Sequence, residues 1–299
     1  MINLKRPITN ITAVALAVVL FSCGGSTKKE SADSSEFDAA ESQIIQDIDK
    51  VVHELPPPSE VPYLLQATGS DFNPDLLNSI DNASKYETSN DKAAMNLGAY
   101  STAIGYLSSY DKAQDALKHM ETCQKLADVI GISSAFDLDL MERFEKNLGN
   151  RDSLANLINL AILTAEQKLE TIDRLNVVAL ILSGSYIEGL YLSIMVIDTY
   201  PDDLLPEASR NLILEPLVKI VLDQHEPLVD VIALLKDLDS DEEIANVIAE
   251  LNILRILYED ELLEIDDQIA NNTGNFVLSK DMLGSITTEI KRIRAEMIK

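Results

Sequence analysis

The residue whose setting most favours chemistry is Glu188, the single acidic group in a long apolar run, LNVVALILSGSYIEGLYLSIMVI, at residues 175–197. In a helix, Ser185 lies one turn before Glu188 and Tyr191 one turn after it. Together with Tyr186 they form a candidate ligand-binding set, because the carboxylate could bind a cation, hydrogen-bond a ligand or transfer a proton. We favour a structural role, in which Lys, Arg or backbone donors of a neighbouring helix satisfy a buried Glu188.

A second set is Asp115, His119 and Cys123, which are spaced four residues apart and could share one helix face. A metal site or a thiol–imidazole pair would need such a face. However, three ligands on one helix do not converge without a second element. Cys123 also continues the apolar side of this segment, where a cysteine packs as a small hydrophobic residue. We therefore expect a structural role for these three residues.

The remaining acidic pattern, Asp237-x-Asp239-x-Asp241, mimics the start of a calcium-binding loop. Such a loop needs Gly at its sixth position and Glu at its twelfth, where this chain has Glu242 and Ile248. The sequence also lacks a nucleophile elbow, a P-loop, a dinucleotide fingerprint and an HExxH motif. We therefore predict no metal, no cofactor and no catalytic residue.

Charge excludes one class of partner. The chain has 50 acidic and 24 basic residues, a formal net charge of −26. Such a surface repels nucleic acid and anionic head groups, so no nucleic-acid partner is expected. Cations or basic partners could bind, but excess acid on solvated helix faces is the simpler interpretation.

The N-terminus indicates the location of the protein. Residues 1–22 have the charged start and apolar middle of a secretory signal peptide, with Lys5 and Arg6 before the apolar stretch. The sequence Leu20-Phe21-Ser22-Cys23 resembles a bacterial lipobox, and this resemblance implies that Cys23 is lipidated and becomes the mature N-terminus. Residues 23–35 then read as the lipidated Cys and a flexible tether, and 36–299 as one helical domain. With Cys23 lipidated, Cys123 has no partner for an intramolecular disulfide.

The rest of the chain predicts an all-α fold, a single bundle or array of about ten helices. At its centre we place the apolar helix of residues 175–198, because a helix that is apolar on every side is normally buried on every side. Its length would also span a membrane, but Ser183, Gly184 and Glu188 interrupt it and no basic cluster flanks it. The other predicted helices lie at 37–52, 59–67, after 73–74, within 89–130 with a break near 108–111, and at 134–148, 152–169, 206–238, 240–270 and 283–297. The only strand candidate is 275–278.

Two finer features are expected in the second half of the chain. Glu215-Pro216-Leu217-Val218 recurs as Glu226-Pro227-Leu228-Val229, and each proline should kink or divide its helix. The apolar seam of the helix at 240–270 passes through Leu254, Tyr258 and Ile265, and Glu261 and Gln268 spoil it. That favours bundle packing over a dimeric coiled coil.

Four stretches resemble an uncharacterised family of all-helical lipoproteins from Bacteroidota-type bacteria. They are Lys85-Tyr86, Asn96-Leu97-Gly98-Ala99-Tyr100, Lys125-Leu126-Ala127-Asp128 through Gly131-Ile132, and Gly184-Ser185-Tyr186-Ile187-Glu188-Gly189-Leu190-Tyr191. The resemblance implies an all-helical lipoprotein and brings no known activity. Surface-displayed lipoproteins of these bacteria often carry acidic residues just after the lipidated Cys. Residues 24–29 have none, so this similarity favours the periplasmic face of the outer membrane.

These observations predict a lipid-anchored helical protein of the cell envelope. We favour a non-catalytic binding or interaction scaffold over an enzyme. Its partners would be the membrane, through the N-terminal lipid, and an envelope protein or small ligand. The alternative is an enzyme, or a protein that binds a cation or small ligand at a buried site around Glu188.

Overall fold

The computed structural model describes residues 42–52, 66, 69–147, 150–170, 174–201, 204, 206–238, 241–265 and 283–299. The predicted signal peptide, Cys23, the tether and the candidate strand at 275–278 lie outside the described residues, as does the predicted helix at 59–67 apart from residue 66. Contacts divide the chain between Gln43 and Ile44, and the helices discussed below belong to Ile44–Lys299, apart from residues 42 and 43 of the first one. The predicted domain boundary at residue 36 stays a prediction.

Every regular element among the described residues is helical, which confirms the all-α fold class. Residues 42–52 form the first described helix. The later elements are η1 (Pro74–Leu76), η2 (Ile80–Asn82), α3 (Ala83–Tyr86), α4 (Asn90–Ser109), α5 (Ala113–Val129), η3 (Ser133–Phe136), α6 (Leu138–Lys146), α7 (Arg151–Glu170), α8 (Leu175–Asp198), α9 (Glu207–Leu222), α10 (His225–Lys236), α11 (Glu242–Leu257), the π-helical turn η4 (Tyr258–Leu262) and α13 (Gly284–Met297).

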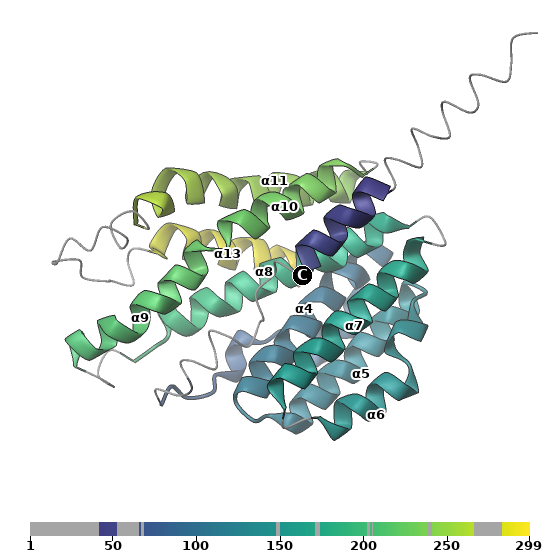
Figure 1. Ribbon diagram of the computed structural model, residues 1–299, viewed down its shortest axis with the longest axis horizontal. Helices are drawn as coiled ribbons and strands as arrows, with labels where there is room; N and C mark the ends of the chain where they lie inside the picture. The colour runs from purple at the N-terminus through teal and green to yellow at the C-terminus, as the bar shows by residue number, and fades with distance from the viewer. Residues whose placement is uncertain are drawn as a thin grey trace, which may run out of the picture. The chain divides into compact units, whose positions relative to one another are not determined.

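Helix α8 lies at the centre of this unit. It contacts α4, α7, α9, α10, α11 and α13. Figure 1 shows it between α4–α7 on one side and α9–α11 with α13 on the other. Its most apolar 18-residue window has a mean hydropathy of 1.7, enough for a membrane span, but 83% of that window is buried inside the protein. The structure therefore uses the apolar run as a core helix, as its composition predicts.

Local signals set the limits of the first long helices. The Ser89 hydroxyl accepts a hydrogen bond from the Lys92 amide at the start of α4. The predicted break near 108–111 is confirmed, since α4 ends at Ser109 and α5 begins at Ala113. Gly131 follows α5 with a φ of +80°, a backbone conformation that favours glycine.

The two prolines of the repeated Glu-Pro-Leu-Val sequence act differently. Pro216 lies inside α9, which continues past it to Leu222. Pro227 stands in the first turn of α10, just after the break at residues 223–224. A proline is tolerated in the first turn because the amide that it lacks has no partner there. The second copy therefore sits where the helix is divided, while the first lies within one.

The seam of α11 contains an extra residue. Regular α-helical spacing would place Glu261 on the buried side, but α11 passes into the π-helical turn η4 at Tyr258. A π-turn has a wider spacing than an α-turn. As a result, Leu262 is buried and Glu261 is exposed. The residue that seemed to spoil the seam therefore lies outside it.

Candidate functional site

The Glu188 carboxylate forms a bidentate ion pair with Arg294 of α13. Arg294 Nε lies 2.9 Å from Glu188 Oε2, and Nη2 lies 3.0 Å from Oε1. Both residues are buried, Glu188 at 1% and Arg294 at 7% relative exposure. Arg294 Nη2 also donates to the Leu76 carbonyl at 3.1 Å. Both carboxylate oxygens are thus engaged by a charged partner, which is the structural role that the sequence favours.

Tyr191 completes this arrangement from one side. The Arg294 guanidinium carbon lies 4.4 Å above the centre of the Tyr191 ring, a cation–π contact. Burial opposes the charge of Arg294, but the Glu188 carboxylate outweighs burial, and the pKa of Arg294 is raised. Burial raises the pKa of Tyr191. The Arg294 guanidinium therefore stays charged, with Glu188 as its partner and the neutral Tyr191 phenol against its face.

A shell of neutral polar groups binds the end of α13, the helix that carries Arg294. The Tyr86 hydroxyl donates to the Ile298 carbonyl at 2.8 Å, and Asn96 Nδ2 donates to the Met297 carbonyl at 3.1 Å. Asn78 Nδ2 bridges these two side chains, at 3.0 Å from the Tyr86 hydroxyl and 3.4 Å from Asn96 Oδ1. The last carbonyls of a helix have no partner within it. Here Tyr86 of α3 and Asn96 of α4 supply the missing donors, and Asn78 of the η1–η2 segment holds these two side chains.

Close packing of α4 on α8 positions this shell. A Cβ atom added at Gly98 would lie 2.0 Å from the Ile181 carbonyl oxygen, and one at Gly184 would lie 2.0 Å from the Met95 carbonyl oxygen. Only residues without a Cβ allow two helix backbones to come this near. Gly189, further along α8, has only an ordinary contact of 3.8 Å. The contact therefore lies one to two turns before Glu188.

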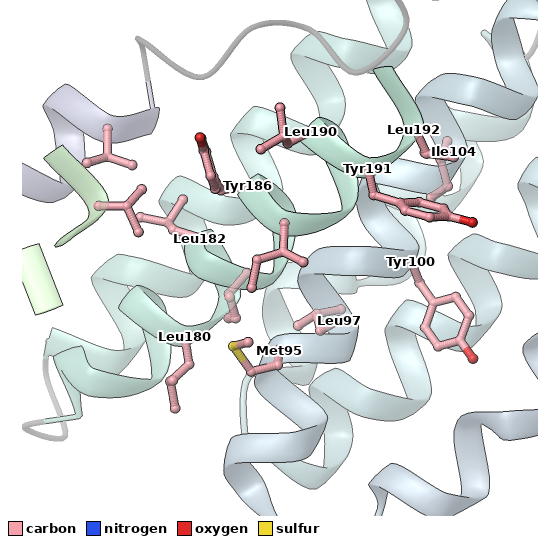
Figure 2. Packing of buried hydrophobic residues seen from close by; sticks show 14 of the residues in the cluster. Met95, Leu97, Tyr100, Ile104, Leu180, Leu182, Tyr186, Leu190, Tyr191 and Leu192 are labelled. Carbon is pink, nitrogen blue, oxygen red and sulfur yellow. The ribbon is translucent and has the colours of Figure 1, made fainter. Parts of the chain in front are cut away.

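The four candidate ligand-binding residues do not form one site. Figure 2 shows Tyr186 and Tyr191 on opposite sides of α8. Tyr186 donates its hydroxyl to the Gln224 carbonyl at 3.2 Å, at the corner between α9 and α10. Ser185 faces α4, where its Oγ would lie 2.9 Å from a Cβ at Gly98. The structure therefore brings Glu188 and Tyr191 together through Arg294 and directs Tyr186 elsewhere.

The sequence interpretation missed Arg294 as the partner of Glu188. However, Arg294 lies four residues after Ile290 and three before Met297, so it shares the apolar side of α13. A basic residue in an apolar stripe is the signal that could have identified it.

Asp115, His119 and Cys123 also have structural partners. His119 Nδ1 lies 2.8 Å from the Asp115 backbone carbonyl, whereas the Asp115 carboxylate pairs with Lys118 at 2.9 Å. Cys123 Sγ lies 3.5 Å from Ser101 Oγ, and burial raises the pKa of its thiol to about 12. Such a thiol is a poor nucleophile. Within the described part of the chain, no three His, Cys, Asp or Glu side chains are placed to share a metal ion.

Asp241, from the pattern that mimics a calcium loop, has a different role. Its side chain accepts a hydrogen bond from the Ile244 amide at 2.8 Å and caps the start of α11.

Comparison with known proteins adds no assignment: no protein-family model, no curated protein and no solved structure matches the chain. The function must be inferred from the residues themselves.

Proposed function

We propose that this chain is a lipid-anchored protein of the bacterial cell envelope that binds a partner without catalysing a reaction on it. The observation that carries this proposal is the buried Glu188–Arg294 pair, since it occupies the residue with the best setting for chemistry. A carboxylate whose two oxygens are bound to a guanidinium has little capacity to act as a base or cation ligand. The alternative of an enzyme or a cation site around Glu188 is correspondingly disfavoured.

The anchor is proposed from residues 1–35. The signal architecture, the lipobox-like Leu20-Phe21-Ser22-Cys23 and the polar stretch after it support lipidation at Cys23. Lipid chains at this point give stable membrane attachment, with the helical domain held at the end of a tether. We place the protein at the outer membrane, facing the periplasm, because residues 24–29 carry no acid.

We also propose membership of the family of helical lipoproteins that the four stretches resemble. Three of those stretches supply members of the polar network described above: Tyr86 from the first, Asn96 from the second, and Glu188 and Tyr191 from the fourth. Residues that are scattered in the chain therefore meet at the C-terminal end of α13. If members of the family share this network, the stretches resemble one another because the fold requires these residues.

Metabolic labelling tests the anchor. A bacterial host expressing the chain is given radioactive palmitate, and the protein is then partitioned between detergent and water. The wild type and Cys123→Ala should carry label and enter the detergent phase, whereas Cys23→Ser should carry none. Cys123→Ala is the matched control because the chain has two cysteines. Equal labelling of Cys23→Ser would overturn the proposal.

A further inference from the structure

One face of α11 differs from the rest of this acidic protein. The exposed positions between residues 245 and 256 are Ala245, Asn246, Ala249, Ile253 and Ile256. None of them is charged, although 25% of the chain is Asp, Glu, Lys or Arg. Ile253 and Ile256 are 41% and 47% exposed, and they lie one turn apart. The face is therefore an uncharged strip with two large apolar side chains.

The charged residues that border this strip are neutralised by neighbours. Glu250 pairs with Arg292 of α13 on one flank. Arg255 pairs with Glu259 at 2.5 Å on the other. The opposite face of α11 is buried against the core through Ile244, Val247, Leu251 and Leu254. The strip is thus the one side of α11 that faces outward, and Figure 1 shows α11 at the margin of its helix group.

Both ends of the strip are acidic. Glu242 is exposed at its start, and Asp260 and Glu261 are exposed in the π-helical turn that follows it. Turns of this type are found disproportionately at functional sites. The order along the surface is therefore acid, apolar strip, acid.

We propose that this outer face of α11 docks a basic amphipathic helix of a partner protein. Twelve residues of α-helix span about 18 Å, enough to match three turns of a partner helix. The partner's apolar side would cover Ile253 and Ile256, and its Lys or Arg residues would meet the acids at both ends. This inference rests on the proposed binding function and names the chemistry of the partner.

Charge disfavours the other occupants. A second copy of the chain would place acidic ends against acidic ends in either antiparallel or parallel alignment, and like charges repel. An anionic membrane would meet the same acids. A basic helix is the occupant whose positive charges would pair with these acids.

The test measures binding of a fluorescent 18-residue Leu/Lys amphipathic peptide to the full lipidated chain in zwitterionic nanodiscs, at physiological salt. The double variant Ile253→Ser/Ile256→Ser should bind the peptide at least tenfold more weakly than the wild type. Leu212→Ser is the matched control, since Leu212 is 75% exposed on α9, and it should bind as the wild type does. A peptide with Glu in place of Lys should not bind. Binding of the peptide to the lipid is the same for every variant on the same nanodiscs, so it cancels when the variants are compared.

Equal affinity of the double variant and the wild type would overturn the proposal, as would hydrogen-exchange protection by the peptide that falls outside residues 245–256. Self-association that the double variant loses, measured by sedimentation, would assign the face to a second copy and also overturn it. None of these results bears on palmitate labelling of Cys23, so the anchor and the docking surface fail separately.

Discussion

Glu188 and Arg294 are each tolerated in the core because of the other. Transfer of one charge from water to a protein interior costs several kcal/mol, and the attraction between two buried charges offsets that cost when the geometry is good. Here the geometry is bidentate and the spare guanidinium hydrogen reaches the Leu76 carbonyl. Removal of one charge therefore leaves the other without compensation.

We expect Glu188→Leu and Arg294→Met each to lower the free energy of unfolding by about 3–5 kcal/mol, because each leaves a buried charge without its partner. The double variant should be more stable than either single variant, since it has neither buried charge. Urea denaturation of the four proteins in the cycle measures the coupling. A coupling near zero would contradict the pairing. A Glu188→Leu protein that is more stable than the wild type would instead mark Glu188 as a functional group held at a cost to folding.

His119 gives the fold a pH dependence. Burial lowers the pKa of His119 from its ordinary 6.5, although the hydrogen bond to the Asp115 carbonyl opposes this shift. The unfolded chain therefore binds a proton on this residue at higher pH than the folded one does. The contribution to stability is complete above about pH 6.5 and is lost as the pH falls below that value.

The comparison with His119→Gln isolates this effect, because glutamine does not titrate. Between pH 7.5 and 5 the wild type should lose more stability than His119→Gln does, measured by urea midpoints at each pH. Parallel curves for the two proteins would show that His119 is protonated without penalty in the folded state.

At the scale of elements, the α4–α8 contact holds together the two helices that bind α13, through Asn96 of α4 and Glu188 of α8. Gly98→Ala and Gly184→Ala should each destabilise the protein by about 3 kcal/mol or more, because each new Cβ meets a backbone carbonyl at 2.0 Å and the helices must separate. Gly189→Ala is the matched control on α8. It should gain up to about 1 kcal/mol from helix propensity, since its Cβ meets only Thr102 Cγ2 at 3.8 Å. Thermal unfolding followed by circular dichroism ranks the three, and equal effects would contradict the close approach.

Patterns in the sequence alone predict most of these elements. Residues 175–198 were predicted as the central helix from composition alone, and the break between α4 and α5 from local signals. The partner of Glu188 could not be obtained in this way, because 106 residues separate it from Arg294 and only the packing of α13 on α8 joins them. Likewise, local signals do not predict the π-helical turn at Tyr258, because its position depends on which side of α11 packs against the core. Elements are encoded locally, whereas contacts between them depend on tertiary register.

At the scale of the whole molecule, the acid excess should weaken the fold. The 50 acidic side chains outnumber the 24 basic ones, which gives a formal net charge of −26. Repulsion among surface charges favours the expanded chain, and salt screens it over a Debye length of about 10 Å at 0.1 M. Surface pairs such as Lys50–Asp230 lose attraction in salt as well, but exposed pairs contribute little to stability.

We therefore expect the unfolding temperature to rise by about 2–4 °C, equivalent to about 1 kcal/mol, between low salt and about 0.5 M NaCl near pH 7.5. The buried Glu188–Arg294 pair is shielded from solvent ions and should not offset the gain. The control is pH, because near the isoelectric point of about 4.3 the net charge vanishes and the effect of salt should shrink with it. Calorimetric scans at both pH values make the comparison. A fall of the unfolding temperature with salt at pH 7.5 would mean that attractive surface pairs, and not acid repulsion, dominate the electrostatic energy of this protein.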